Sequence, residues 1–165
     1  MRRVNGFLFF WGDWPSNWEH SPFKLEGIRY NCVEQYMMAE KARLFGDHST
    51  LKRIMSSSDP ATQKRLGRSV AGFKSSLWDG VRYQVVFRGN LEKYRQNPEL
   101  RKLLLETGND KLVEASPEDK IWGIGTRKDE RGVENPKNWK GQNLLGKAIT
   151  QVRETIRKEF PNERP

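Results

Sequence analysis

The stretch Asn31-Cys-Val-Glu-Gln-Tyr-Met-Met-Ala-Glu-Lys-Ala-Arg-Leu-Phe45 carries most of the structural information in this sequence. It predicts a helix that begins at Asn31, runs to about Phe45 and stops at Gly46, since glycine commonly follows the end of a helix. At roughly 100° per residue, Glu34 and Lys41 lie about 20° apart on this helix. Both fall in the middle of its apolar stripe.

The same projection places Gln35, Glu40 and Arg43 on the opposite, solvated side. Ionisable groups on an apolar face are unfavourable unless they are paired, solvated in a cleft or used in catalysis or ligand binding. Glu34 and Lys41 are two turns apart, about 10 Å along the axis, which is too far for a simple side-by-side pair. A cleft that holds a polar ligand is the simplest explanation, and it makes both residues candidate catalytic groups.

Each of the two residues also has a structural explanation. Asn31-x-x-Glu34 resembles a capping box, in which the carboxylate reaches back to the start of the helix. Lys41 can lay its aliphatic stem along the core and keep its ammonium group in water. The shared apolar face favours a site over either explanation taken alone, and both explanations stay open at this point.

The bulk properties indicate one domain of 165 residues, with its core over about 8–158 and a frayed tail at 160–165. One cysteine, and two histidines without ligand spacing, predict no disulfide, no metal and no cofactor. The absence of a long apolar run or a secretory pattern predicts a cytoplasmic protein without a membrane partner. The net charge of +9 suits a phosphate-bearing ligand or nucleic acid, and equally a solvated basic surface. The oligomeric state is left open.

The remaining pattern predicts a predominantly helical α+β fold with a small N-terminal β element. The β element consists of a strand at 6–11 and a hairpin at 23–30 that turns at Glu26-Gly27. Further helices are expected at 60–70, 78–95, 98–108 and 142–159, and a short strand at 111–115. The charged segment 126–140 is expected to be a binding loop or lid.

Several motifs resemble the NADAR (YbiA-like) family, beginning with Asn31-Cys-Val-Glu34-Gln35-Tyr36-Met-Met-Ala-Glu-Lys41-Ala42. The others follow in the family order: Lys64-Arg-Leu-Gly67-Arg68, Lys93-Tyr-Arg-Gln96, Leu104-Leu-x-Thr107-Gly108, Leu112-Val-Glu-Ala115, Asp119-Lys-Ile-Trp122-Gly123-Ile-Gly125 and Trp139-Lys-Gly141-Gln-Asn143-Leu-Leu-Gly146. Together they cover nearly the whole chain. One position departs from the pattern, because Gln35 stands where the family often has histidine.

The resemblance implies a compact YbiA-like fold and hydrolysis of N-glycosidic bonds without a metal. Two substrate classes are associated with the family: phosphoribosylamino-pyrimidine intermediates of riboflavin synthesis, which release ribose 5-phosphate, and ADP-ribose attached to guanine bases of nucleic acid. The basic charge favours the second class. A non-catalytic module that binds ADP-ribose is the alternative from another class of function.

The expected site combines catalytic and binding residues. Asp119 is a candidate acid for the leaving nitrogen, or else a cap after Ser116. Arg68 is a candidate phosphate holder, and Trp122 can stack on a base or ribose, although each also suits an ordinary surface or core position. The other substrate-binding candidates are Gly123, Gly125, Trp139 and Asn143. The cations of the late loop that can face phosphates are Arg127, Lys128, Arg131, Lys137 and Lys140.

Overall fold

The predicted N-terminal strand forms as β2 (Phe7–Phe10) in the computed structural model, which describes residues 1–163. β2 pairs antiparallel with β1 (Arg2–Val4), which the sequence reading had not predicted, and parallel with β5 (Lys111–Glu114), giving the order β1-β2-β5. The register sets Leu8 opposite Leu112. Because the central strand has neighbours on both edges, its backbone groups are paired along the ladder.

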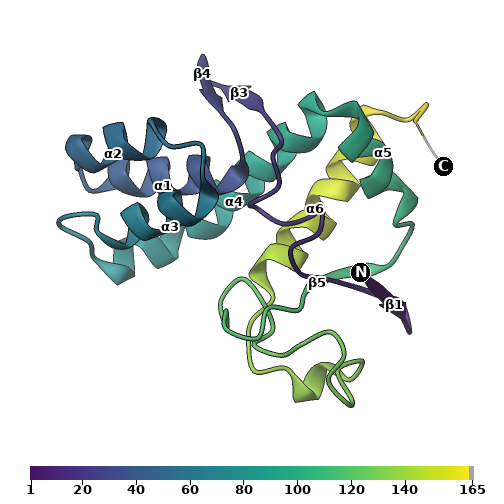
Figure 1. Cartoon of the computed structure of the whole chain (residues 1–165). Coiled ribbons are helices and arrows are strands. Elements are labelled where there is room, and N and C mark those ends of the chain that lie inside the picture. The colour runs from purple at the N-terminus through teal and green to yellow at the C-terminus, as the bar shows by residue number, and fades with distance from the viewer. Residues whose placement is uncertain (164–165) are drawn as a thin grey trace. The chain divides into compact units, whose positions relative to one another are not determined.

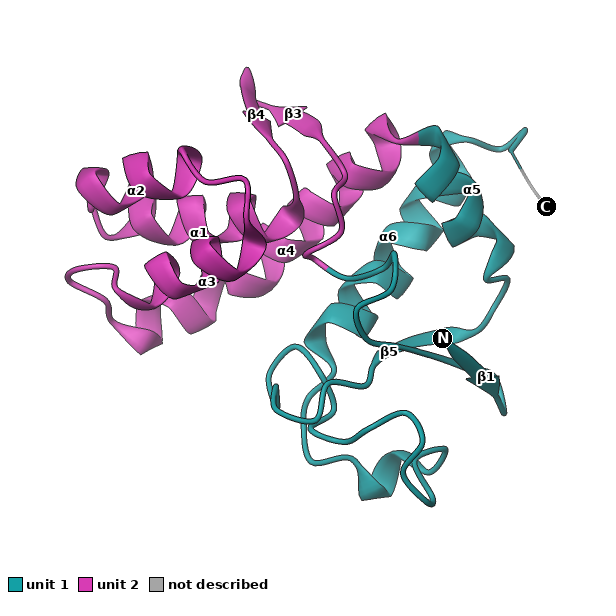
Figure 2. Ribbon diagram, in the orientation of Figure 1, with its two compact units in different colours: residues 1–16, 98–165 teal, residues 17–97 magenta. Residues whose placement is uncertain are grey.

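The chain divides into two compact units, coloured separately in Figure 2. Unit 1 comprises Met1–Ser16 and Pro98–Pro165, and unit 2 comprises Asn17–Asn97. Unit 2 is therefore inserted in the sequence between β2 and β5 of unit 1. This explains why two strands that pair in one sheet lie about a hundred residues apart in the sequence.

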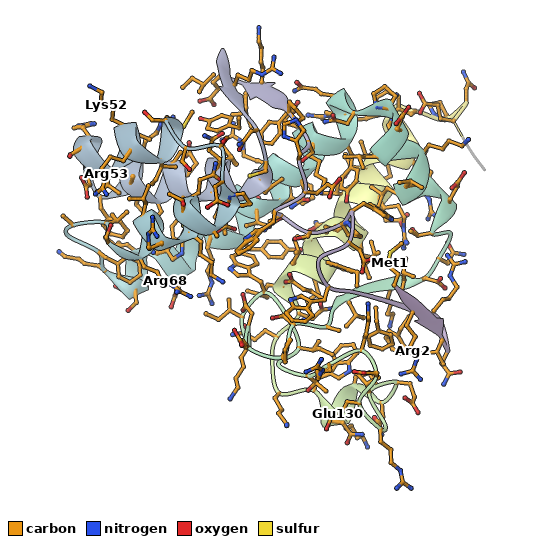
Figure 3. The ribbon with its side chains drawn as sticks, in the orientation of Figure 1. Met1, Arg2, Lys52, Arg53, Arg68 and Glu130 are labelled. Atoms are coloured by element: carbon orange, nitrogen blue, oxygen red, sulfur yellow. The ribbon has the colours of Figure 1, made fainter. Side chains whose placement is uncertain are left out.

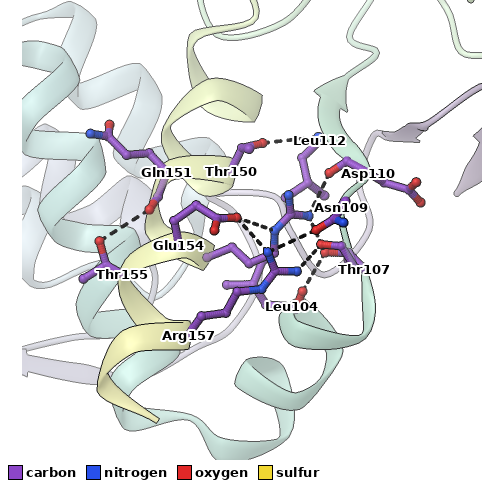
Figure 4. Close-up of polar contacts among 12 residues, drawn as sticks. Leu104, Thr107, Asn109, Asp110, Leu112, Thr150, Gln151, Glu154, Thr155 and Arg157 are labelled. Carbon is purple, nitrogen blue, oxygen red and sulfur yellow. Dashed lines mark hydrogen bonds and ion pairs between the residues drawn. The ribbon is translucent and has the colours of Figure 1, made fainter. Parts of the chain in front are cut away.

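Unit 1 adds α5 (Pro98–Glu106), the short 3-10 helix Pro136–Asn138 and α6 (Leu144–Glu159) to its sheet. The buried Arg153 of α6 donates hydrogen bonds at 2.7 Å to Thr107 Oγ1 and to the Asp110 carbonyl oxygen. Figure 4 shows these groups with the neighbouring Arg157, which reaches the Gly108 carbonyl and Asn109. The arginines of α6 thus satisfy backbone groups of the turn that leads into β5.

The described part of the C-terminal tail, residues 160–163, is not frayed as predicted, because Arg101 of α5 contacts it. Arg101 of α5 donates to both carboxylate oxygens of Glu163, at 2.7 and 2.8 Å, and its guanidinium lies 4.0 Å from the centroid of the Phe160 ring. A bidentate arginine–carboxylate pair has a well-defined geometry. Residues 160–163 are therefore held against α5, and the last two residues of the predicted tail, 164–165, lie outside the described residues.

Unit 2 is built around α1 (Val33–Leu44), as Figure 1 shows. This helix contacts α2 (His48–Met55), α3 (Pro60–Arg68) and α4 (Ser75–Gln96). The predicted hairpin forms as β3 (Phe23–Leu25) and β4 (Ile28–Tyr30), and both turn residues, Glu26 and Gly27, have positive φ. The predominantly helical α+β fold class is confirmed. Phe10, Trp78 and Tyr94 are buried in the core.

The start of α1 differs from the predicted capping box. The N-cap position is Cys32, which makes no side-chain cap hydrogen bond. Gln35 Oε1 accepts from the Asn31 backbone N–H at 2.8 Å, and Gln35 Nε2 donates to the carbonyl oxygens of Ile54 and Ser57. Gln35, and not Glu34, therefore reaches back to the beginning of the helix.

The solvated position predicted for Gln35 is wrong. Every residue from Val33 to Ala39 is buried, and Gln35 is 4% exposed. The projection assumed that α1 has one apolar and one wet face, whereas neighbouring helices cover it on several sides. Gln35 tolerates burial because its amide nitrogen bonds the backbone around the end of α2 and its amide oxygen bonds the backbone before α1.

Helix α2 lies in a segment to which the sequence reading assigned no element. Its N-cap is Asp47, whose carboxylate accepts from the Thr50 N–H and hydroxyl and from the Ala71 N–H. The hydrogen bond from Ala71, followed by those from Thr50, lowers the pKa of Asp47 to about 2. The carboxylate therefore both begins α2 and attaches the segment that follows α3.

Candidate functional site

Glu34 is buried in the first turn of α1, where it is 4% exposed. Its backbone N–H donates to the Asn17 carbonyl oxygen at 2.9 Å, which holds the N-terminal loop of unit 2 against the start of the helix. The capping task assigned to it as an alternative is performed by Gln35. Glutamate side chains are seldom buried this fully, and this makes Glu34 a functional candidate.

Lys41 is half-buried two turns further along α1. Its Nζ lies 4.5 Å from the centroid of the Phe73 ring, so one side of the amine meets an aromatic surface. Desolvation lowers the pKa of Lys41, the negative charge of Glu34 opposes this effect, and the positive charge of Arg68 adds to it. A lysine whose amine is partly desolvated and lies near another cation is easier to deprotonate and use as a nucleophile.

Arg68 is the last residue of α3 and is exposed. Its charge acts on Lys41 together with that of Glu34. The predicted residues Glu34, Lys41 and Arg68 therefore lie close enough within unit 2 for the charges of Glu34 and Arg68 to act on the Lys41 amine. The arrangement offers a carboxylate, an amine with a lowered pKa and a guanidinium that can bind a phosphate.

The other six predicted site residues belong to unit 1, and three of them form a tight turn after β5. Asp119 Oδ1 accepts from the N–H groups of Ile121 and Trp122, and the Asp119 N–H donates to Ser116 Oγ. A side chain on Gly123 would meet the carbonyl oxygens of Asp119 and Glu114 at 2.9 Å, and Gly125 has a φ of +62°. The turn itself therefore requires Asp119 and both glycines.

Trp139 and Asn143 are also held by structural contacts in unit 1. Trp139 Nε1 donates to the Val133 carbonyl oxygen at 2.7 Å, and its ring packs edge-on against Phe7 and Phe9. Asn143 accepts from the Glu114 N–H and donates to the Leu112 carbonyl oxygen, so its side chain joins the start of α6 to β5. These bonds account for both residue types without a ligand.

Trp122 is partly exposed, and its backbone N–H donates to Asp119 Oδ1. Its stacking on a base or ribose stays a prediction. The late loop is anchored by the fully buried Val133. Two of its cations lie near carboxylates, Arg127 at 3.7 Å from Asp129 and Lys128 at 3.9 Å from Asp13.

Three residues of unit 2 were not picked out from the sequence. Phe73 covers the amine of Lys41, Asn17 holds the start of α1, and Lys93 is fully buried in α4. Phe73 lies in a segment without a motif, and the contact of Asn17 is made by its backbone. Only Lys93 had a signal, because it belongs to one of the recognised motifs.

Within residues 1–163, no group of three or more His, Cys, Asp or Glu side chains is arranged to hold a metal ion. In the same range, none of the helices has the length and apolar character needed to cross a membrane.

The comparisons with known proteins identify the family. The model of the NADAR domain matches residues 9–157, a span that includes parts of both units. The chain therefore belongs to the NADAR family, which confirms the resemblance seen in its motifs.

Named relatives extend this result. The chain is 50% identical over 130 residues to an N-glycosidase of Acanthamoeba polyphaga mimivirus, covering 78% of this chain and 76% of that protein. It is 31% identical over 155 residues to an N-glycosidase of Nostoc punctiforme, covering 91% and 92%. The NMR structure of the Escherichia coli protein YbiA superimposes with a TM-score of 0.76 at 30% identity, covering 94% and 87%. The predicted enzyme class, a hydrolase acting on N-glycosyl bonds, is confirmed at the level of these relatives.

Proposed function

We propose that the chain is an N-glycoside hydrolase that removes ADP-ribose from guanine bases of nucleic acid, with Glu34 and Lys41 as its catalytic residues. The observation that carries the proposal is the half-buried Lys41, whose pKa is lowered, in the same electrostatic neighbourhood as buried Glu34 and exposed Arg68. The relatives are named N-glycosidases, which supports hydrolysis of an N-glycosyl bond without specifying the substrate.

The chemistry follows from the substrate bond. A sugar joined at C1 to an exocyclic amine can open its ring, and C1 then becomes an imine carbon. The neutral Lys41 amine adds to C1, and the bond from C1 to the guanine nitrogen breaks as that nitrogen takes up a proton. The product is guanine and an imine between Lys41 and the sugar. Water then adds to this imine, which releases the sugar aldehyde and restores the lysine.

Glu34 suits the proton transfers of this sequence. It can take a proton from the attacking amine or water and deliver it to the departing guanine nitrogen. The whole reaction consumes one water molecule and needs no oxidant or reductant. In this proposal Arg68 holds a phosphate of the ADP-ribose, because a guanidinium binds phosphate oxygens in bidentate fashion. Trp122 remains a proposed stacking residue, whereas Asp119 is engaged in its turn and receives no step.

The net charge of +9 is the feature that favours a nucleic-acid substrate over a free nucleotide. A phosphoribosylamino-pyrimidine presents the same bond and needs the same three groups, so it is the comparison substrate. A guanine within a duplex has to leave the stack before its amine can reach a lysine. Single-stranded nucleic acid therefore provides the more accessible substrate.

The imine provides a direct test of this mechanism. Borohydride added during turnover of a guanine-ADP-ribosylated oligonucleotide is expected to fix the sugar on the wild-type chain, and peptide mapping should place it on Lys41. Lys41→Ala and Lys41→Arg should both abolish trapping, because arginine keeps the charge but lacks a primary amine that can form the imine. Trapping that persists in either variant, or an adduct mapped to the buried Lys93, would contradict the role given to Lys41.

A further inference from the structure

Helices α2 and α3 carry the densest unpaired positive charge of unit 2. Between residues 48 and 70 the sequence has five cations and one carboxylate, Asp59. That carboxylate begins α3, where it accepts from the N–H groups of Ala61 and Thr62. None of the cations forms an ion pair with a residue in the described range 1–163; they are Lys52, Arg53, Lys64, Arg65 and Arg68.

A hollow of about 380 Å³ lies between the C-terminal turn of α2 and the first turns of α3. Three of the five cations line it, Lys52 and Arg53 from α2 and Arg65 from α3. The hydroxyl groups in its wall are used locally, since Thr62 Oγ1 donates to Asp59 and Ser56 Oγ donates to the Lys52 carbonyl oxygen. The groups left for a ligand are therefore the cations, which are exposed.

The exposed side of α3 extends this charge beyond the hollow. Lys64 and Arg68 are four residues apart, and Arg65 and Arg68 are three apart, so the three side chains are neighbours on one helical surface. Figure 3 shows Lys52, Arg53 and Arg68 extending outward from unit 2. The five cations thus extend from the hollow along α3, and they are called the basic strip below.

An aromatic side chain lies at the far edge of this strip. Lys64 Nζ is 5.8 Å from the centroid of the Trp18 ring, and Trp18 keeps 44% of its surface exposed. An exposed tryptophan beside a basic strip is the combination by which proteins bind single-stranded nucleic acid, since the bases stack on the ring while cations follow the phosphates. An acidic peptide would use the cations but gain little from the ring.

We infer that this strip, from the α2–α3 hollow to Trp18, binds the backbone and one base of a single-stranded nucleic acid. The inference rests on the proposed function only where it takes the bound strand to be the substrate. The contacts themselves do not require catalysis. The late loop of unit 1 is less suited to this task, because Arg127 and Lys128 already lie near carboxylates.

The test measures binding of a fluorescent, unmodified single-stranded oligonucleotide by anisotropy at several salt concentrations. The combined variant Lys52→Ala, Arg53→Ala and Arg65→Ala is expected to bind at least about tenfold more weakly at low salt. Its slope of log affinity against log salt should fall by about 2, because each lost phosphate contact on a single strand contributes about 0.7. Trp18→Ala should weaken binding roughly tenfold and leave the salt slope unchanged.

A variant with the same loss of charge elsewhere in unit 2 provides the control. Lys24→Ala, Arg29→Ala and Lys74→Ala remove three exposed cations that lie outside the strip, and wild-type affinity is expected. An equal loss in this control would overturn the inference, because overall charge would then explain binding. Competition by poly-glutamate as effective as that by oligonucleotide would overturn it as well, in favour of an acidic peptide.

Release of sugar from ADP-ribosyl guanosine separates this inference from the proposed function. The strip variant should hydrolyse this small substrate at the wild-type rate and lose activity only on the modified oligonucleotide. A wild-type chain that binds oligonucleotide through the strip but hydrolyses neither substrate would refute the proposed function alone. Unchanged oligonucleotide binding by the strip variant would refute the strip alone.

Discussion

Replacing Glu34 by glutamine is expected to lower the rate of sugar release by about 100- to 10,000-fold, the range typical of a lost general acid–base group. Glutamine has nearly the same shape and keeps hydrogen bonding, but it does not exchange a proton. The hydrogen bond from the Asn31 N–H to Gln35 Oε1 at the start of α1 does not involve the Glu34 side chain and is kept. The measurement is the initial rate of ADP-ribose release under saturating substrate, with thermal unfolding recorded in parallel.

Glu40→Gln is the matched control for this experiment. Glu40 belongs to the same helix, and its carboxylate forms a partly exposed ion pair with Arg43 at 2.7 Å. A surface pair of this kind contributes only about 0.2–1 kcal/mol to stability, so activity should change little. Equal activity of Glu34→Gln and wild type would remove Glu34 from the chemistry. A folded Glu40→Gln as inactive as Glu34→Gln would show that the assay responds to any loss of charge on α1.

Lys93 should make the stability of the protein depend strongly on pH. Desolvation lowers its pKa from 10.5 to about 7, against the opposing charge of Glu19. Between these two values the unfolded chain binds a proton at this position and the folded chain does not. This contribution to the free energy of unfolding therefore rises with pH, by up to about 1.4 kcal/mol per unit, and becomes constant below about pH 7.

The variant Lys93→Met removes this titration and keeps an unbranched side chain in α4. Its stability relative to wild type should therefore be highest at pH 7 and decline steadily towards pH 9. Urea unfolding at pH 7, 8 and 9 measures the change. Burial raises the pKa of Cys32 to about 11, so the Cys32 thiol does not ionise in this pH range. Lys147→Met, an exposed change in α6, should show a constant difference. Parallel pH profiles for Lys93→Met and wild type would contradict the account.

Much of the fold could be predicted because its signals are local. The Asp59-Pro60 start of α3, the Glu26-Gly27 turn and the end of α1 before Gly46 all depend on residues adjacent in sequence. Helix α2 was not predicted, because eight residues give only a weak helical periodicity of apolar positions. The burial of Gln35 could not be read from one helix, because it depends on where the end of α2 packs.

The candidate site was predictable in part for the same reason. Glu34 and Lys41 share a helix, so their common face follows from helical geometry. The effect of Arg68 on Lys41 and the cover of the amine by Phe73 depend on tertiary packing. The bond between Asn143 and β5 is also tertiary, and Asn143 makes it from a left-handed backbone conformation that its motif does not indicate. The reaction itself came from family resemblance, because spacing alone does not specify a substrate.

The most direct test of the central claim is a comparison of sugar release by the wild-type chain from two substrates. One is a guanine-ADP-ribosylated single-stranded oligonucleotide, and the other is a phosphoribosylamino-pyrimidine. The account predicts release of ADP-ribose and unmodified guanine from the first substrate, faster than any release of ribose 5-phosphate from the second, with a rate that falls as salt is raised. Turnover of neither substrate, together with tight binding of free ADP-ribose, would contradict it and identify a non-catalytic binding module.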